Sequence, residues 1–297
     1  MKILVTGACG FVGGFLKKEL AAHGHEVIAQ DRVPAADVQF DISDVEGTAE
    51  AVAKLHFDAC IHLAGIAFVP RGWTEPKMMF DVNVGGTINL LDAFREFAPK
   101  ARVLVVTTSQ IYGNSPRPAP IREEDLCEPD NIYAVAKLAA DQTTLLYHRR
   151  YGSAFMTARP ANHIGPGQSP DFVVPSFAKQ LREIAAGKRE PKIFVGNLES
   201  IREFTDVRDI ARAYRLLIEN GKPGSAYNLA SGRFVTIRWI LDKLCEIAGV
   251  KPEIIVDPKL FRPTDEQPHL DFSRVAHDVG WRPEIPIEQS LADIFAA

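Results

Sequence analysis

The sequence lacks the features that mark several large classes of protein. Its 297 residues carry a formal net charge of −4, so there is no surplus of basic side chains with which to hold nucleic acid or an anionic membrane. No apolar stretch is long enough to cross a membrane, and the apolar run at the start is too short for a signal peptide. Internal repeats and low-complexity segments are also missing. We therefore expect a cytoplasmic globular protein with neither nucleic acid nor a membrane as partner.

The sequence is also poor in cysteine, with four scattered residues and no C-x-x-C pair. Cys60 and Cys245 lie in apolar segments, which predicts reduced and buried thiols. Cys9 lies inside a glycine-rich turn, where a small side chain is expected simply to fill space. We expect no metal site.

What the sequence does contain is a glycine-rich turn in KILVTGACGFVG, residues 2–13. Residues 3–5 predict a buried parallel strand, and apolar residues at helical spacing from Val12 to Leu20 predict a helix directly after it. Gly7 and Gly10 lie between the two, and Gly13 lies in the first turn of the helix. Glycine lets backbone N–H groups approach a phosphate at the positive end of a helix, so this turn predicts a dinucleotide site.

An acidic residue follows at the position expected for such a site. A second strand is predicted from Glu26 to Ala29, and Asp31 lies 18 residues beyond Gly13. A carboxylate there can accept hydrogen bonds from the adenosine ribose, which slightly favours NAD. Arg32 leaves NADP open, because a guanidinium can hold a 2′-phosphate.

Strands and helices alternate through the next 80 residues. This pattern predicts an α/β fold with a Rossmann-type doubly wound parallel sheet. Ligands of such sheets gather at the carboxyl ends of the strands. The expected elements are strands at 38–42, 59–65 and 102–109 and helices at 45–55 and 84–97.

Polar and small residues stand at these strand ends. Asp41 and Ile42 follow the third strand and are placed to meet the adenine, although a helix N-cap is an equally good interpretation of Asp41. Ala64 and Gly65 would let the backbone approach the pyrophosphate and ribose. His62 is expected to be a packed, hydrogen-bonded side chain and not a catalyst.

Tyr133 and Lys137 lie one turn apart on a predicted helix and therefore share a face. A lysine ammonium near a phenol favours the phenolate, so we expect the pKa of Tyr133 to fall toward neutrality. Tyr133 could then exchange a proton with a carbonyl or alcohol oxygen, and Thr108 could hydrogen-bond the same oxygen. Hydride would pass between that carbon and a nicotinamide.

Together TGACGFVG, Asp31, HLAG, Thr108 and YAVAK resemble the motifs of the extended short-chain dehydrogenase/reductases, the NAD-dependent epimerase/dehydratase family, which act on nucleotide sugars. The resemblance covers essentially the whole chain. It implies Thr108, Tyr133 and Lys137 as the catalytic set. It implies cofactor contacts from Gly7, Gly10, Phe11, Val12, Gly13, Asp31, Arg32, Asp41, Ile42, Leu63, Ala64, Gly65, Asn83, Tyr133, Lys137 and Pro160. Asn83 either holds the backbone around this site or lies on the surface.

Later segments resemble the branch of GDP-mannose 4,6-dehydratases and GDP-4-keto-6-deoxy-mannose reductases. They are ARPANHIGPGQSPDFVVPSFAKQ, VGNLESIREFTDVRDIARAY, AYNLASG and LFRPTDEQ. This implies substrate contacts from Thr108, Ser109, Gln110, Asn162, Val173, Lys179, Arg202, Arg262 and Asp265. Two arginines can grip a pyrophosphate bidentately, although a lone arginine more often forms a surface salt bridge.

Gln110 departs from the dehydratase pattern, which has a glutamate at this position. An amide cannot exchange the proton that dehydration requires, whereas ketone reduction needs only the Tyr, Lys and Thr side chains and a hydride donor. The expected activity is NAD(P)H-dependent reduction of GDP-4-keto-6-deoxy-D-mannose to GDP-D-rhamnose or its C4 epimer. The alternatives are a nucleotide-sugar 4-epimerase with tightly bound NAD and a non-catalytic nucleotide-binding protein.

The chain is expected to form two domains. Residues 1–165, rejoined by 202–230, would bind NAD(P), and residues 166–201 and 231–297 would form a smaller mixed α/β domain that binds the nucleotide sugar. The substrate would then lie in the cleft between them. The family resemblance also implies a homodimer.

Overall fold

The computed structural model describes residues 1–114, 119–261 and 269–297. Its centre is a seven-stranded parallel sheet in the order β11-β6-β5-β4-β1-β2-β3. The strands are β1 (Lys2–Thr6), β2 (Glu26–Asp31), β3 (Val38–Gln39), β4 (Ala59–His62), β5 (Arg102–Val106), β6 (Phe155–Pro160) and β11 (Ala226–Leu229). The strand order reverses at β1, so the crevice between β1 and β4 is where such folds bind ligands. The expected Rossmann-type sheet is confirmed.

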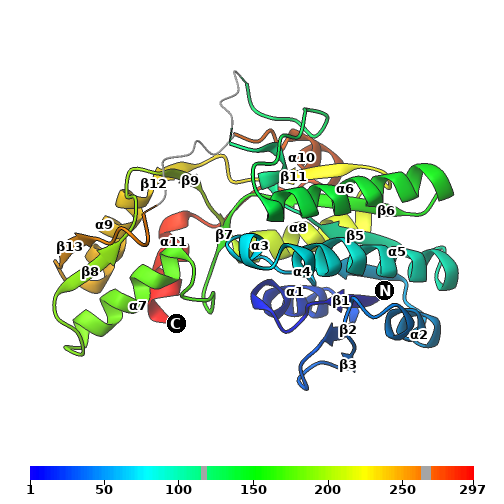
Figure 1. Ribbon diagram of the computed structural model, residues 1–297, viewed down its shortest axis with the longest axis horizontal. Coiled ribbons are helices and arrows are strands. Elements are labelled where there is room, and N and C mark those ends of the chain that lie inside the picture. Colours follow the sequence, from blue (N-terminus) through cyan, green and yellow to red (C-terminus); the bar gives the residue numbers. More distant parts are fainter. Residues whose placement is uncertain (115–118, 262–268) are drawn as a thin grey trace.

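Helices cover both faces of this sheet (Figure 1). On one face α1 (Phe11–Ala22) packs on α8 (Val207–Asn220), and their apolar side chains share one core with β1 and β6. On the other face α2 (Val45–Leu55), α5 (Gly86–Phe97) and α6 (Ile132–Tyr151) lie in sequence, with a second core beneath them. Both faces of the sheet are therefore buried, which explains its nearly continuous apolar strands.

Several expected elements differ in length. The strands expected at 59–65 and 102–109 end at His62 and Val106. The strand expected at 38–42 pairs only as β3, Val38–Gln39. The helix expected from residue 84 begins at Gly86, because a π-helical turn, η1 (Asp81–Gly85), precedes it. Two short helices, α3 (Arg71–Thr74) and α4 (Pro76–Phe80), lead into that turn. Single π turns in helices occur frequently at functional sites.

A smaller lobe, on the left in Figure 1, has its own core. It contains α7 (Val173–Ala185), α9 (Ile237–Ala248), α11 (Ile287–Ala296) and the parallel pair β8 (Lys192–Val195) and β13 (Glu253–Val256). Two further pairs lead into it: β7 (His163–Ile164) with β10 (Thr205–Asp206), and β9 (Ile201–Glu203) with β12 (Phe234–Thr236).

The segment around α10 (Ser273–Val279) packs on the large sheet. Val275 and Trp281 are fully buried in the core formed by α1 and α8. The Trp281 indole N–H donates a 2.8 Å hydrogen bond to the carbonyl of Asp209 in α8. The domain boundaries proposed above assign this segment to the smaller domain, whereas its side chains pack with the larger one.

Within the described residues, none of the helices combines the length and the apolar character needed to cross a membrane. The same part of the chain has no group of histidine, cysteine or acidic side chains arranged to hold a metal ion. The four cysteines are free; Cys60 is buried and Cys245 is half-buried.

Candidate active site

The glycine turn is built so closely that side chains would not fit. Gly7 has a positive φ of 65°, and a Cβ there would lie 2.9 Å from the Cα of Ala64. A Cβ at Gly13 would lie 2.5 Å from the carbonyl oxygen of Ala8. Gly10 is the N-cap of α1, and no side chain within the described residues caps this end. The turn therefore leaves an open helix N-terminus, which fits a dinucleotide pyrophosphate.

Asp31, at the end of β2, is held against this turn. One carboxylate oxygen accepts a hydrogen bond from the N–H of Cys9 at 3.0 Å, and the other accepts from the N–H of Arg32 at 2.7 Å. The guanidinium of Arg32 reaches the carboxylate of Asp41 at 3.3 Å. The carboxylate of Asp31 is thereby fixed in position, while Arg32 is engaged by another acid.

Asp41 is not a helix cap, so that interpretation is wrong. Asp44 is the N-cap of α2 and accepts from the N–H of Glu46. Asp41 instead accepts from the hydroxyl and the N–H of Ser43, and these hydrogen bonds hold the pKa of its carboxyl below the usual value. Ile42, beside it, is buried under Gly86.

Asn83 lies in the π turn and is buried, which rules out the surface interpretation. Its amide oxygen accepts from the N–H of Ile66 at 2.7 Å, and its amide nitrogen donates to the carbonyl of Ile66 at 3.1 Å. A Cβ at Gly65 would lie 2.8 Å from the same amide oxygen. Asn83 thus holds the backbone that follows β4 and Leu63.

His62 is buried in a chain of hydrogen bonds, as expected. Its Nδ1 lies 2.7 Å from the hydroxyl of Thr6, which itself accepts from the N–H of Ala64. Its Nε2 lies 3.2 Å from the hydroxyl of Thr87, which donates to the carbonyl of Asn83. Because the Thr87 hydroxyl already donates its proton to that carbonyl, it can only accept a hydrogen bond from His62. The Nε2 atom of His62 therefore carries the proton and donates, and its Nδ1 atom accepts from Thr6. Burial, with a smaller contribution from the Lys137 ammonium, lowers the pKa of His62 to about 3, so the ring is neutral.

The structure brings Thr108, Tyr133 and Lys137 together at the carboxyl end of β5. All three are buried, and the side chains of Thr108 and Tyr133 are hydrogen-bonded. The Lys137 ammonium donates a 2.9 Å hydrogen bond to the carbonyl of Val106, the last residue of β5. A Cβ at Gly65 would lie 3.4 Å from this ammonium. The lysine is therefore beside the backbone expected to meet the cofactor ribose.

The expected fall in the pKa of Tyr133 is wrong for the chain alone. Burial raises its pKa to about 12, and the hydrogen bond with Thr108 offsets only part of this rise. Burial also lowers the pKa of Lys137 to about 8. The free-energy cost of moving a phenolate out of water exceeds the stabilisation that the phenolate gains from its polar neighbours. Tyr133 is therefore a neutral phenol near pH 7.

Ser109 and Gln110 follow Thr108 in a 3₁₀ turn, η2 (Ser109–Tyr112). The Thr108 hydroxyl caps this turn by accepting from the N–H of Gln110 at 3.3 Å. The side-chain oxygen of Gln110 accepts from the amide of Asn131 at 3.4 Å. Asn131 is the N-cap of α6 and was not expected to take part in the site. A polar residue two positions before the tyrosine was the only sequence signal for it.

The other residues expected to contact substrate lie on elements that join or form the smaller lobe. Val173 opens α7, and Lys179 is exposed on the same helix. The carbonyl of Asn162 accepts from the N–H of Thr205, and Arg202 lies on β9. Arg262 and Asp265 fall outside the described residues. Pro160, at the end of β6, is buried.

A buried ion pair behind the site was not expected from the sequence. Arg159 in β6 and Asp141 in α6 are almost fully buried and form two hydrogen bonds of 3.0 and 2.6 Å. Arg159 also donates to the hydroxyl of Tyr112 at 2.7 Å, and Asp141 accepts from Thr107 at 3.3 Å. The pair therefore ties α6, the helix that carries Tyr133 and Lys137, to the strand ends. Its residues are 18 apart in sequence, so no local pattern marks it.

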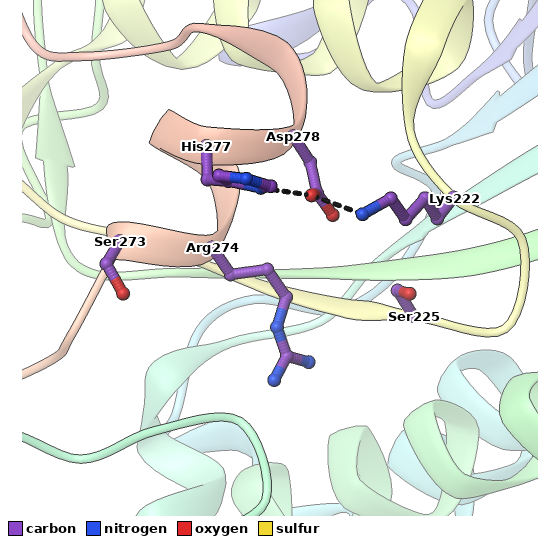
Figure 2. A pocket seen from close by; sticks show the side chains of 6 residues that line it. All are labelled: Lys222, Ser225, Ser273, Arg274, His277 and Asp278. Atoms are coloured by element: carbon purple, nitrogen blue, oxygen red, sulfur yellow. Dashed lines mark hydrogen bonds and ion pairs between the residues drawn. The ribbon is translucent and has the colours of Figure 1, made fainter.

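A separate pocket opens at the amino end of β11 (Figure 2). Lys222 and Asp278 face one another across it, 2.6 Å apart, and His277 approaches the same carboxylate at 2.9 Å. Arg274, also on its wall, is paired with Glu123 and Glu124. Each cation is already paired, and the pocket lies at the opposite end of the strands from Thr108, so it is not the active site.

Comparison with known proteins agrees with this geometry. The family model described as GDP-mannose 4,6 dehydratase matches residues 4–294. This chain belongs to the NAD-dependent epimerase/dehydratase family. The GDP-6-deoxy-D-mannose reductase of Pseudomonas aeruginosa is 36% identical over 99% of this chain and 96% of its own length.

Solved structures of epimerase/dehydratase relatives superpose closely on the whole chain. RMD from Pseudomonas aeruginosa, complexed with NADPH, has a TM-score of 0.90 at 34% identity and covers 100% of this chain and 98% of its own. The Thermus thermophilus UDP-glucose 4-epimerase, in complex with NAD, has a TM-score of 0.87 at 27% identity over the same shares. This epimerase/dehydratase family member is thus related to NAD(P)-dependent enzymes of nucleotide sugars.

Proposed function

We propose that this chain is an NAD(P)H-dependent reductase that acts on the 4-keto group of a GDP-linked 4-keto-6-deoxy sugar. The product would be GDP-D-rhamnose or its C4 epimer. The observation that carries the proposal is Gln110, which stands beside Thr108 where the dehydratases have a glutamate. The 36% identity to a GDP-6-deoxy-D-mannose reductase over nearly the full length supports it.

In this mechanism the nicotinamide, when bound, supplies the hydride that adds to C4 of the sugar. Tyr133 gives its phenolic proton to the C4 oxygen, and Thr108 hydrogen-bonds that oxygen and orients the ketone. With a pKa of about 12, Tyr133 is protonated near pH 7, which is the form that ketone reduction requires. Lys137 holds its ammonium beside Gly65 and would bind the nicotinamide ribose.

The glycine turn and Asp31 would hold the rest of the cofactor. The N–H groups at the start of α1 would bind the pyrophosphate, and the carboxylate of Asp31 would accept hydrogen bonds from the adenosine ribose. Both NAD and NADP remain in the proposal, with NAD slightly favoured, because the carboxylate of Asp31 would repel a 2′-phosphate while Arg32 is paired with Asp41. Asn162, Val173, Lys179 and Arg202 would contact the nucleotide sugar.

The test is to mix the purified chain with NADH or NADPH and GDP-4-keto-6-deoxy-D-mannose and to follow the absorbance of the reduced nicotinamide. We expect the absorbance to decay, and we expect the decay to be lost in Tyr133→Phe. The variant should still bind the cofactor, because the glycine turn, Asp31 and Lys137 are unchanged. Absence of decay with either cofactor would refute the reductase.

A 4-epimerase is the second candidate, favoured by the close superposition with the Thermus thermophilus enzyme. It would use Thr108, Tyr133 and Lys137 to move the proton of the C4 oxygen, while bound NAD would accept the hydride from C4 and return it to the opposite face. It differs from the reductase in keeping its cofactor through the cycle. Tightly bound NAD in the purified chain, with interconversion of UDP- or GDP-hexoses, would favour it. Cofactor binding without any turnover would instead indicate a non-catalytic nucleotide-binding protein.

A further inference from the structure

Gln110 and Asn131 lie on the two elements that carry the proposed catalytic side chains. Gln110 comes two residues after Thr108, in the first turn of η2. Asn131 comes two residues before Tyr133, at the start of α6. Both side chains are half-buried, and they meet through a 3.4 Å hydrogen bond. This contact joins the threonine end of the site to the tyrosine end.

The direction of this hydrogen bond is set by helix capping. As the N-cap of α6, Asn131 accepts the N–H of Ala134 on its Oδ1 at 2.9 Å. A helix N-terminus requires an acceptor at this position, so the amide of Asn131 cannot be turned the other way. Its Nδ2 is left to donate, and it does so to Asp130 at 2.9 Å and to Gln110.

The orientation of Gln110 follows from that of Asn131. A donor on Asn131 needs an acceptor opposite, so Gln110 must present its oxygen, Oε1, to Asn131. Its Nε2 then points away from Asn131. Within the described part of the chain, this NH₂ group donates to no other residue and is not a fully buried atom. Gln110 therefore has a donor to offer beside Thr108.

We propose that Asn131 is a positioning residue: by holding Oε1 of Gln110, it makes Gln110 present its Nε2–H group to an acceptor oxygen of the sugar. This inference rests on the proposed function, because it assumes that a nucleotide sugar binds beside Thr108. A glutamate at position 110 would accept from Asn131 with one oxygen and present a second acceptor to the sugar. Asn131 thus makes residue 110 present a hydrogen-bond donor to the sugar when that residue is glutamine. It would make the same residue present a basic carboxylate oxygen if that residue were glutamate.

The decisive variant is Asn131→Ser. Serine caps helices about as well as asparagine, so the stability of α6 should be retained. Its side chain is too short to reach Gln110, so Gln110 loses its fixed orientation. We expect KM for the keto sugar to rise about tenfold, the order expected for one hydrogen bond, with a smaller change in kcat and an unchanged melting temperature.

Two further variants complete the test. Gln110→Ala should raise KM by a similar factor, and adding Asn131→Ser to it should have no further effect, because the two residues act through one contact. Asn131→Ala, which also removes the cap, should lower the melting temperature. An unchanged KM in Asn131→Ser, or independent effects of the two substitutions on KM, would overturn the proposal.

A second readout separates this inference from the proposed activity. In the isotope-labelled chain, Gln110→Ala identifies the side-chain NH₂ signals of Gln110 in an ¹⁵N–¹H NMR spectrum. Asn131→Ser should shift those signals whether or not the chain reduces the ketone. If the wild type fails to reduce the ketone but the signals move, the proposed substrate is wrong and the positioning contact stands. Unmoved signals overturn the contact itself.

Discussion

The Lys137 ammonium donates a hydrogen bond to the carbonyl of Val106 across 2.9 Å. Lys137 lies on α6 and Val106 ends β5, so the contact joins the helix that carries Tyr133 to the strand that leads to Thr108. The same hydrogen bond keeps the charged ammonium of Lys137 at a position where this residue is only 8% exposed. Burying an ammonium group lowers the stability of the folded chain, because the charge loses its hydration. The same loss of hydration lowers the pKa of Lys137.

Lys137→Met should therefore stabilise the fold near neutral pH while abolishing the proposed activity. Below pH 8 Lys137 is protonated in both the folded and the unfolded chain, and the buried charge costs on the order of 3 kcal/mol. Between pH 8 and the ordinary value of 10.5 the folded chain releases its proton first, so wild-type stability rises with pH. The advantage of the methionine variant should shrink across this window.

Urea denaturation at several values from pH 7 to pH 10 measures this difference. Above pH 10 Tyr133 acts in the opposite direction, because its pKa of about 12 in the fold exceeds the ordinary 10 and stability falls as the unfolded chain ionises. Lys18→Met, at an exposed position of α1, is the control and should show no such trend. A pH-independent gap between wild type and Lys137→Met would contradict the prediction.

Gly13 and Gly14 are adjacent in α1 but should respond to alanine in opposite ways. A Cβ at Gly13 would lie 2.5 Å from the carbonyl oxygen of Ala8, whereas a Cβ at Gly14 meets nothing within 4 Å. Gly13→Ala must displace the turn, so we expect cofactor affinity to fall by at least about tenfold and stability to drop. Gly14→Ala should gain about 1 kcal/mol from helix propensity and leave cofactor binding unchanged. NADH titration and thermal unfolding of the pair test this.

Asp41 should influence the choice between NAD and NADP through Arg32. The two side chains are 3.3 Å apart, and the side chain of Arg32 is 71% exposed. Asp41→Asn removes the charge that engages Arg32. The ratio of NADPH affinity to NADH affinity should therefore rise about threefold or more. Arg32→Ala is the matched control and should lower NADPH affinity with little effect on NADH. Equal cofactor ratios in wild type and Asp41→Asn would show that the ion pair is irrelevant to this choice.

Asp141→Asn should be strongly destabilising, because it leaves the charge of Arg159 buried without its partner. The two side chains are 0% and 2% exposed, and breaking a buried pair in this way costs about 3–5 kcal/mol. Glu50→Gln breaks the exposed pair of Glu50 with Lys54 and should change stability by less than about 1 kcal/mol. Urea unfolding compares the two variants, and a cost at Asp141 as small as that at Glu50 would contradict the prediction.

Much of the part of this protein built on the large parallel sheet follows from the sequence. The strand, glycine turn and helix at residues 2–20 are local features, since apolar periodicity and glycine spacing act over a few residues. The parallel sheet follows from the alternation of strands and helices, and it places the ends of β1 and β4 at one edge. That Thr108, Tyr133 and Lys137 would meet at a strand end could therefore be expected before their contacts were known, as could the packed role of His62.

Tertiary structure decided what depends on burial and on partners distant in the chain. The pKa of Tyr133 rises because the surrounding elements exclude water, and a lysine one helical turn away does not reverse this. Asp41 pairs with Arg32 because the ends of β2 and β3 lie side by side, not because of any helix that follows. The link from Asn131 to Gln110 spans 21 residues, and the ion pair of Arg159 with Asp141 spans 18. No local pattern encodes such distances, because only the packed fold brings the partners together.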